Sequence, residues 1–250
     1  GAIINFSNAG LVAQADRLAR SSRLGIPLLV GLDIVHGYRT IFPLPLAMAA
    51  SFDAGLVRRA AAAQGRESAA IGLNWTFSPM ADVARDLRWG RVVEGLGEDP
   101  WLTGRLTAAQ VEGFRDGGLA STLKHFAGYS AVLGGRDYDA TFVAPTELHD
   151  LHLPPFRDGI RAGADAVMTA LTALNGLPTT ADSTLMTGLL RRQMGFSGLV
   201  VADWQAVASL VKHGVAHDGA EAARKALLAG VDMDMTSGLF LRHLPEEVRA

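Results

Sequence analysis

The sequence contains no cysteine, and this absence excludes disulfide bridges, thiol nucleophiles and cysteine-ligated metals. It also lacks any run close to the roughly 18 consecutive apolar residues that a membrane-spanning helix requires. The net charge is only -2, and no block of basic residues is present. Neither nucleic acid nor an anionic membrane is therefore an expected partner.

Several catalytic motifs are missing as well. No Walker sequence is present to cradle a phosphate, no Gly-x-Gly-x-x-Gly opens a helix, and no Gly-x-Ser-x-Gly elbow offers a serine. The 7 histidines are scattered without metal-ligand spacing, so we expect no metal and no cofactor. What remains is a set of Asp, Arg, Lys, His and Trp residues, which suits a neutral polyhydroxylated substrate such as a sugar.

Short apolar segments alternate with helical ones along the 250 residues, 49% of which are hydrophobic. Such alternation is typical of βαβ units around a parallel sheet, and the chain is long enough to bury one large core. The expected strands are Ala2–Phe6, Pro27–Val35, Asn74–Val83, Ala120–Phe126, Ala166–Leu171, Leu199–Asp203 and Val231–Met235. The expected helices are Leu11–Arg23, Leu56–Ile71, Thr103–Asp116, Glu147–Ala162, Leu185–Met194 and Glu221–Ala229, and another starts near Ala206.

Seven strands at this spacing favour an α/β fold of the (β/α)8 TIM-barrel type over a doubly wound sheet. Because only seven strands are visible, we expect the barrel to be incomplete at its termini. Either its eighth strand is irregular or it lies outside the chain. Since Gly1 leads directly into the apolar segment Ala2–Phe6, we also expect further sequence upstream.

The segment Leu199–Asp203 ends a β-branched apolar run in a single carboxylate, which Trp204 follows. An acid at the carboxyl end of a buried strand is costly unless it is paired or used. In a (β/α)8 barrel, that end of the strand is where chemistry takes place. Asp203 is therefore the leading candidate for a catalytic carboxylate. The alternative is that Asp203 only caps the helix that starts near Ala206.

Other polar residues recur just after the expected strands. They are Asp33, His36, Asp82, Lys124, His125, Asp232 and Asp234. Each has a structural alternative; Asp82, for example, can pair with Arg85 or Arg88. Their coincidence at one edge of successive strands nevertheless favours a common site, because buried ionisable groups need mutual partners.

Taken together, these residues resemble the N-terminal (β/α)8 domain of glycoside hydrolase family 3, in its β-glucosidase branch, over residues 1–250. The motifs are specific in combination and in this order, although each is weak alone. They are Leu32-Asp33-Ile34-Val35-His36-Gly37, the run from Ser78-Pro79-Met80-Ala81-Asp82-Val83 to Trp89-Gly90-Arg91, Gly97-Glu98-Asp99-Pro100, Lys124-His125-Phe126, Leu174-Asn175-Gly176, Gly195-Phe196-Ser197-Gly198 and Ala202-Asp203-Trp204. The resemblance implies that a C-terminal α/β sandwich domain belongs with this chain but is absent from it.

The resemblance also implies a retaining exo-β-glycosidase, most simply a β-glucosidase that removes terminal non-reducing β-D-glucosyl residues from a β-glucoside or oligosaccharide. Asp203 matches the nucleophile, which forms a covalent glycosyl-enzyme. The matches to the sugar-holding residues are Asp33, Arg91, Lys124, His125 and Arg136, and Trp204 is expected to wall the subsite. In this interpretation Asp33 accepts hydrogen bonds from the sugar, whereas Lys124 and His125 donate them. Arg91 and Lys124 would help to keep Asp203 ionised, as an attacking carboxylate must be.

Three departures from the family pattern matter. Ala202 stands where serine is usual, and Leu171 stands where many members carry an aromatic residue. The third concerns the acid/base, because a retaining glycosidase needs a second carboxyl group about 5–5.5 Å from the first. In the β-glucosidase branch that glutamate comes from the later domain, so this chain alone is expected to lack it. The branch that uses an Asp-His pair is disfavoured, because the loop 136–141 contains no histidine.

Rival interpretations stay open at this point. The missing acid/base and Leu171 are compatible with a catalytically inactive sugar-binding barrel or an inert fragment. An aldolase-type barrel would instead use Lys124 as a Schiff-base amine. Within the family, a β-xylosidase is the alternative specificity. The sequence leaves the oligomeric state open, a homodimer included, and analogy with relatives favours a periplasmic or secreted location.

Overall fold

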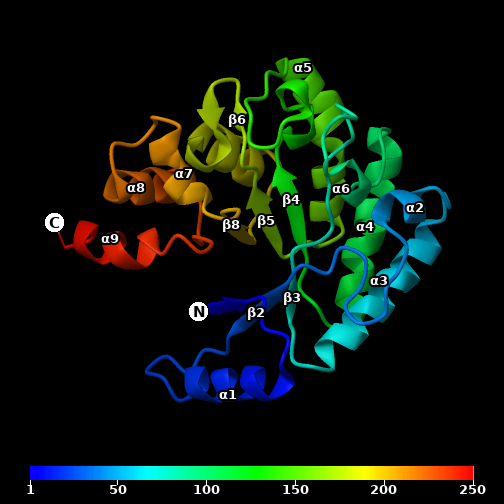
Figure 1. Cartoon of the computed structure of the whole chain (residues 1–250), viewed down its shortest axis with the longest axis horizontal. Coiled ribbons are helices and arrows are strands. Elements are labelled where there is room, and N and C mark those ends of the chain that lie inside the picture. The colour runs from blue at the N-terminus through cyan, green and yellow to red at the C-terminus, as the bar shows by residue number, and fades with distance from the viewer. Residues whose placement is uncertain (250) are drawn as a thin grey trace.

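The computed structural model describes residues 1–249 and has parallel strands inside and helices outside (Figure 1). One three-stranded sheet has the order β1 (Ala2–Ile4), β2 (Leu29–Leu32) and β3 (Trp75–Thr76). A second has the order β4 (Thr122–Phe126), β5 (Ala166–Thr169) and β8 (Leu199–Val201). Isolated parallel bridges, Trp75–Ala120 and Met80–Lys124, connect the two sheets. The six strands therefore follow one another in a single curved series.

The register of the strands is regular except at one point. β1 pairs with β2 from Ala2–Leu29 to Ile4–Gly31, and β5 pairs with β8 from Ala166–Leu199 to Met168–Val201. Between β4 and β5 the register shifts in the interval from Leu123 to Phe126. This irregularity falls at Lys124 and His125, two adjacent residues that both make contacts within the site described below.

Helices cover the outer side of the strands. They are α1 (Ala9–Arg20), α2 (Pro45–Ala49), α3 (Ala54–Ala69), α4 (Pro100–Asp116), α5 (Pro145–Glu147), α6 (Pro154–Arg161), α7 (Ala206–Lys212), α8 (Gly219–Ala229) and α9 (Leu239–Glu247). Asp53, Asp99 and Asp218 begin α3, α4 and α8, and each side chain accepts a backbone N–H from the first turn. Such caps satisfy donors that the helix itself leaves unpaired.

Smaller elements lie in the connections between strands and helices. The 3₁₀ segments are η1 (Val92–Glu94), η2 (Tyr129–Ala131), η3 (Leu133–Gly135) and η5 (Thr179–Ala181), and the π-helical segments are η4 (Leu148–His152) and η6 (Thr184–Gln193). An antiparallel hairpin joins β6 (Ala173–Leu174) to β7 (Leu177–Pro178). Within residues 1–249, no helix combines the length and the apolar character needed to cross a bilayer.

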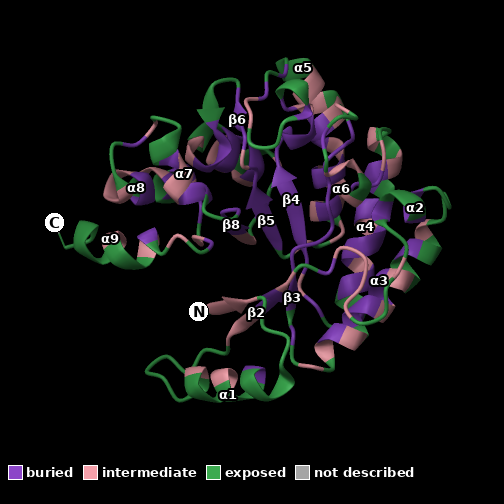
Figure 2. Cartoon of the chain, in the orientation of Figure 1, coloured by how far each residue is buried: buried purple, intermediate pink, exposed green. Residues whose placement is uncertain are grey.

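The hydrophobic core lies between the second sheet and its helices, where the ribbon in Figure 2 is purple. All residues of β4 and β5 are buried. Phe126 of β4 meets Phe156 of α6 edge to face, with 5.1 Å between the ring centroids. Strands that are buried on both faces consist of continuous apolar runs rather than alternating patterns. The polar residues that β4 carries must therefore find their partners inside the protein.

The sequence predicted most of these elements, but several are shorter than expected. β3 is confirmed at Trp75–Thr76 only, and the expected strand Val231–Met235 is wrong as a regular strand. That segment makes one parallel bridge, between Val201 and Met233. The expected helix Glu147–Ala162 is divided into α5, η4 and α6, because Pro154 and Pro155 lack the N–H groups that a continuous helix needs. The hairpin β6–β7 and helix α9 were not predicted.

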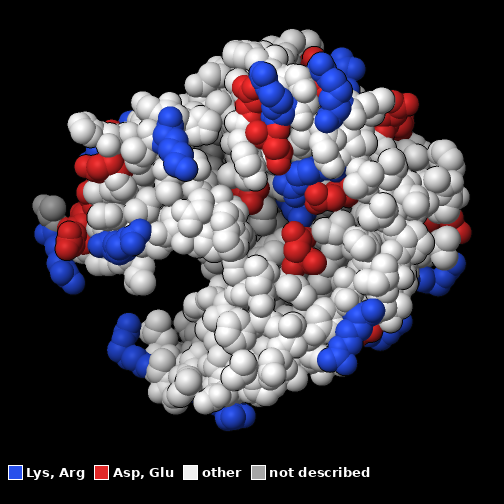
Figure 3. Space-filling view, in the orientation of Figure 1, with Lys and Arg blue, Asp and Glu red and all other residues white. Residues whose placement is uncertain are grey.

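The strand series stays open on one side in the part of the chain that is described. Within residues 1–249, no backbone pairing joins β1 to the segment 231–235. Figure 3 shows a deep notch in the molecular surface, and in the same view of Figure 1 this notch lies between α1 and α9. The structure therefore establishes an α/β fold with a curved parallel strand series, without a closed ring.

Candidate active site

A cavity of about 150 Å³ lies at the carboxyl ends of the central strands. Its walls come from both sides of the open strand series, because Ile4 at the end of β1 and Met235 beyond β8 both line it. Six of the predicted site residues line the same cavity, namely Asp33, Arg91, Lys124, His125, Asp203 and Trp204. Figure 3 shows acidic and basic side chains gathered in a hollow near the middle of this face. The fold thus brings these six residues together from four separate parts of the sequence.

Asp33 and Lys124 form an ion pair at this cavity. The Nζ atom of Lys124 lies 2.9 Å from Oδ1 and 3.0 Å from Oδ2 of Asp33. The side chain of Lys124 is 2% exposed, whereas that of Asp33 is 49% exposed. A buried ammonium needs a compensating partner, and Asp33 supplies it while keeping its outer surface open to the cavity.

Asp82 and His125 form a second, fully buried pair behind the cavity. One oxygen of Asp82, Oδ2, accepts the backbone N–H of His125 at 2.8 Å and lies 2.8 Å from its Nδ1 atom. Burial raises the pKa of Asp82 to about 7. Burial also lowers the pKa of His125, and the charges of Arg91 and Lys124 act in the same direction.

This pairing corrects the expected partners of Asp82. Arg85 instead pairs with Glu147, and Arg88 with Asp86. The sequence did place Asp82 at the polar edge of the strands. It gave no means of choosing His125 as the partner, because 43 positions separate the two residues.

Asp203 is buried, with only 8% of its surface exposed. Its Oδ1 atom accepts the backbone N–H of Trp204 at 2.5 Å. Its Oδ2 atom has no hydrogen-bond partner among the described residues and lies 3.7 Å from Nε2 of His125. Helix α7 begins after Gln205 and is not capped by any side chain of residues 1–249. The side chain of Asp203 therefore does not have the capping role that the sequence left open.

The charge state of Asp203 depends on opposing effects. Burial is the largest and raises the pKa of this carboxyl, because it penalises the charged form. The N–H of Trp204 and the charges of Arg91 and Lys124 act in the opposite direction. The two cations thus favour the ionised form, as expected from the sequence, but the net direction of the pKa shift is upward.

Arg91 is fixed beside Asp203 by a fork of hydrogen bonds to Glu94. The two contacts measure 2.8 and 3.0 Å, a bidentate geometry in which both partners are charged. The guanidinium carbon also lies 5.7 Å from the ring centroid of Tyr129 and 6.0 Å from that of Trp89. Burial lowers the pKa of Arg91, but the bonded Glu94 outweighs this effect and the net shift is upward. Arg91 therefore stays cationic in its pocket.

Arg136 lies away from the cavity in this structure. It is not among the residues of the described chain that line the cavity. Its side chain is 73% exposed, and its guanidinium lies 2.6 Å from Asp139. The loop that carries it is anchored nearby, because Asp137 accepts the indole N–H of Trp89 at 2.8 Å. Gly135 has a left-handed backbone with φ of +68°, and a Cβ there would lie 2.6 Å from the backbone of Arg88. The loop can pack this closely only because that position is glycine.

A second cavity of about 410 Å³ adjoins the first. Arg91, Asp203 and Trp204 line both cavities. The second is lined in addition by Tyr138, Leu171, Gln205, Ser209, Lys212 and His213. Trp204 and Tyr138 are 53% and 61% exposed. Asp203 therefore lies between a small polar chamber and a larger chamber with aromatic walls. The sequence did not identify Tyr138, Gln205, Ser209, Lys212 and His213 of the larger chamber as parts of a site.

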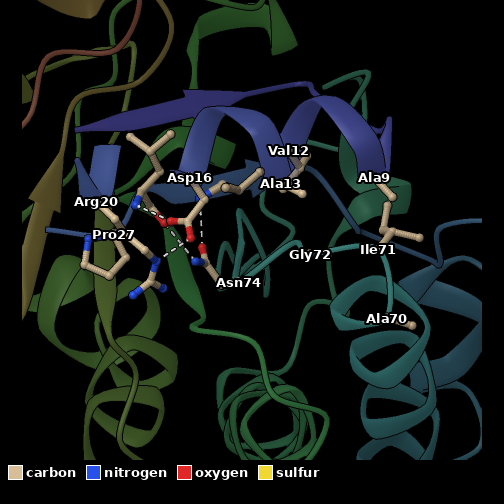
Figure 4. A pocket seen from close by; sticks show the side chains of 12 residues that line it. Ala9, Val12, Ala13, Asp16, Arg20, Pro27, Ala70, Ile71, Gly72 and Asn74 are labelled. Atoms are coloured by element: carbon tan, nitrogen blue, oxygen red, sulfur yellow. Dashed lines mark hydrogen bonds and ion pairs between the residues drawn. The ribbon is translucent and has the colours of Figure 1, made fainter. Parts of the chain in front are cut away.

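A third cavity, of about 430 Å³, lies at the opposite, amino ends of β2 and β3 (Figure 4). Its polar side chains are already bonded to their neighbours. Asp16 binds Arg20 at 2.6 Å and accepts the N–H of Leu28, while Asn74 accepts the N–H of Val30 at 2.8 Å. These contacts fasten α1 to β2, so this hollow has a structural explanation.

Two further polar residues singled out by the sequence, Asp232 and Asp234, have structural partners, whereas the buried Nδ1 atom of His36 has none among the described residues. Asp232 accepts hydrogen bonds from Arg191 and from the N–H of Val200. Asp234 accepts the hydroxyl of Ser237 and the N–H of Leu239 at the start of α9. Within the described residues, no group of three or more Asp, Glu and His side chains has an arrangement that could hold a metal ion.

Comparisons with known proteins agree with the family resemblance. The profile of the Glycosyl hydrolase family 3 N terminal domain matches residues 1–246. The periplasmic beta-glucosidase of Salmonella typhimurium is 41% identical over 100% of this chain and 34% of its own length. A putative beta-xylosidase of Formosa agariphila is 36% identical over 93% of this chain and 32% of its own length.

Solved structures agree in the same way. The beta-glucosidase from Listeria innocua in complex with glucose has a TM-score of 0.97 and 38% identity, over 100% of this chain and 36% of that one. A mutant of the same enzyme in complex with laminaribiose also has a TM-score of 0.97, at 37% identity. The chain belongs to glycosyl hydrolase family 3 and corresponds to its N-terminal domain. It spans about a third of the length of these relatives.

Proposed function

We propose that the protein containing this chain is a retaining exo-β-glycosidase, specifically a β-glucosidase, and that this chain binds the terminal sugar and supplies the nucleophile. The observation that carries the proposal is the environment of Asp203. Its Oδ2 atom is unbonded within residues 1–249 and belongs to a cavity that also contains Asp33, Arg91, Lys124 and His125. A polar cavity beside an unpaired carboxylate oxygen suits attack on the anomeric carbon of a bound sugar.

In the proposed reaction, ionised Asp203 forms a bond to the anomeric carbon as the glycosidic bond breaks. The leaving-group oxygen takes a proton from a general acid. In the second step, the residue that gave this proton acts as a base on water, which then releases the sugar from Asp203. Asp33 accepts hydrogen bonds from sugar hydroxyls, and Arg91 and Lys124 donate them. Arg136 and Trp204 are proposed to contact the sugar as well, Arg136 after movement of its exposed side chain.

The acid/base is assigned to a glutamate of a C-terminal α/β sandwich domain outside this chain. The fact that the chain spans only about a third of its relatives supports this assignment. We also propose that the strand series closes into a (β/α)8 barrel. Ile4 and Met235, from the two ends of the series, already line one cavity, and a strand from outside the chain would fill the position between β1 and the segment 231–235.

The two chambers divide the substrate between them in this proposal. The small polar chamber holds the terminal sugar, because its charged groups match hydroxyls. The larger chamber holds the leaving group, and the exposed rings of Trp204 and Tyr138 offer it flat apolar surfaces. Asp203 and Arg91 line both chambers, so the bond to be broken would lie between them.

The test is turnover of 4-nitrophenyl β-D-glucoside and β-D-xyloside by the whole protein, with the first-formed anomer identified by proton NMR. The β-anomer of glucose should form first, and the glucoside should be the better substrate. Preference for the xyloside would favour a β-xylosidase, a reading supported by the beta-xylosidases among the relatives. Initial formation of the α-anomer would refute retention, and binding without turnover of either substrate would identify an inactive sugar-binding barrel.

A further inference from the structure

The pair Asp82–His125 is fully buried and is joined by two contacts. Each side chain is 1% exposed, and a single oxygen of Asp82 contacts two nitrogens of His125. The backbone N–H can only donate, so Oδ2 of Asp82 is an acceptor in this contact. An acceptor at 2.8 Å from Nδ1 favours the tautomer in which Nδ1 carries the proton.

The rest of the imidazole ring is also fixed. Tyr129 packs edge to face against it, with 4.9 Å between the ring centroids. The far nitrogen, Nε2, then lies 3.7 Å from Oδ2 of Asp203, and His125 lines the proposed sugar chamber. Asp82 itself does not line that chamber, so any effect of Asp82 on a bound sugar must pass through His125.

We propose that Asp82 is a positioning residue that holds His125 in the Nδ1–H tautomer, so that Nε2 accepts a hydrogen bond from a sugar hydroxyl beside Asp203. This inference rests on the proposed function. It reverses the direction of the hydrogen bond expected from the sequence, in which His125 donates. A sugar hydroxyl can donate as well as accept, so the tautomer decides which of the two it does at this position.

The charges around the pair are consistent with this assignment. Arg91 and Lys124 face it as cations, and Glu94 and Asp203 face it as acids. Burial raises the pKa of Asp82 to about 7, and burial and the two cations lower the pKa of His125. Above pH 7, the pair therefore consists of an ionised Asp82 and a neutral His125 with its proton on Nδ1. Below pH 7, Asp82 takes up a proton and can donate it in a hydrogen bond to Nδ1 of His125. The ring proton then lies on Nε2, which can no longer accept a hydrogen bond from the sugar.

The first test observes the tautomer directly and needs no activity. The whole protein, labelled with ¹⁵N-histidine, is examined by ¹⁵N NMR at pH 8, and the His125 signals are assigned by their loss in His125→Gln. The proposal predicts a protonated Nδ1 and an unprotonated Nε2 in the wild type. Asp82→Leu leaves Nδ1 without an acceptor, so the tautomer should no longer be fixed and a protonated Nε2 should appear. A wild type with the proton on Nε2 would overturn the proposal.

The second test asks whether the effect reaches one sugar hydroxyl. The substrates are 4-nitrophenyl β-glucoside and its monodeoxy analogues. The matched control is Asp116→Leu, which changes an exposed carboxylate paired with Arg58. Asp82→Leu should lower kcat/KM for the parent glucoside about 10- to 100-fold, the usual range for a hydrogen bond in a polar site. The loss should disappear for one deoxy analogue, the same one for which the loss in His125→Gln disappears.

The outcomes separate the inference from the function on which it rests. An equal loss for every analogue would mean that Asp82 only supports the fold, and would refute positioning. If the wild-type protein hydrolyses no glycoside, the proposed function fails, and the NMR measurement still decides the tautomer. If Asp82→Leu does not fold, the spectrum of the wild type alone tests the predicted proton position.

Discussion

The Nζ atom of Lys124 lies 2.9 and 3.0 Å from the two carboxylate oxygens of Asp33, although 91 positions separate these residues in the sequence. The lysine is almost fully buried, whereas about half of the aspartate side chain is exposed. Lys124 therefore depends on the ion pair more than Asp33 does. Water can solvate the exposed carboxylate if the pair is broken, but it cannot reach the buried ammonium. The same contact turns Asp33 toward the cavity in which we place the sugar.

This unequal dependence can be measured as stability. Asp33→Asn should lower the free energy of unfolding by on the order of 2 kcal/mol, because it leaves a buried ammonium without its counter-charge. Lys124→Met should cost less, since it replaces the ammonium with an apolar group of similar length. Urea denaturation of both variants and of the double variant tests this order. Equal losses for the two single variants would contradict it.

The leaving-group chamber predicts a substrate-dependent effect of Tyr138. Tyr138→Ala should lower kcat/KM for aryl β-glucosides about 3- to 10-fold, through loss of an aromatic contact. It should not change kcat/KM for β-glucosyl fluoride, whose leaving group is too small to touch the ring. Phe142→Ala removes a similarly exposed ring, at a position outside the lining of either chamber in the described chain, and serves as the control. Equal effects on both substrates would remove Tyr138 from the leaving-group site.

The unbonded Oδ2 atom of Asp203 predicts an effect of residue 171. Leu171 and Asp203 line the same chamber, and the pKa of Asp203 is raised by burial. Because the ionised form attacks, the rate of covalent labelling should fall as the pH is lowered. The midpoint of this fall should lie above 3.8, the ordinary pKa of this side chain. Leu171→Tyr supplies a hydroxyl donor and should move this fall to lower pH, whereas Leu171→Phe, with the same ring and no hydroxyl, should not. A shift of the same size in both variants would show that the ring, rather than a hydrogen bond, is responsible.

His152 predicts a pH dependence of stability that is independent of the active site. Its side chain is buried, its Nε2 atom has no partner within residues 1–249, and burial lowers its pKa to about 4. The native state favours the neutral form, so this stabilisation is complete above the unfolded value of 6.5 and is lost as the pH falls toward 4. The loss is about 3 kcal/mol, since each pKa unit corresponds to about 1.4 kcal/mol.

The check is urea denaturation at several pH values between 7.5 and 4. His152→Phe should lose this part of the pH dependence. Between pH 7.5 and pH 4, its free energy of unfolding should therefore fall less than that of the wild type. His217→Phe, at an exposed position, should keep the wild-type slope. If His152→Phe also keeps the wild-type slope, His152 is not the titrating group.

The sequence predicted the strands β4 and β5 well, because short segments rich in apolar residues alternate with helical segments there. It also placed Asp203 at the end of its strand, and the motifs identified the family. It failed at Val231–Met235, where apolar and acidic residues alternate as in a strand, but the segment pairs on one side only in residues 1–249. Whether a segment pairs depends on its neighbours in space, and its own composition does not reveal them.

Within the site, residue types were predictable but contacts were not. Asp82 was recognised as a polar strand end, yet its partner is His125 rather than a nearby arginine. The sequence pattern placed Arg136 among the sugar-holding residues, and in this structure it binds Asp139 instead. Tyr138 was missed as part of a site, because a single aromatic residue in a loop belongs to no motif or periodic pattern in the sequence. A chamber wall is defined by the fold, which here brings residue 138 close to residues 203–213.

The central claim is that Asp203 is the nucleophile, and covalent trapping tests it most directly. The whole protein is incubated with an activated 2-deoxy-2-fluoro-β-glucoside, whose leaving group departs without acid assistance, and its intact mass and peptides are then measured. The account predicts the addition of one fluorosugar, located on the peptide that contains Asp203, and no labelling of Asp203→Asn. A label on a different carboxylate, or steady turnover with no labelling at all, would contradict it.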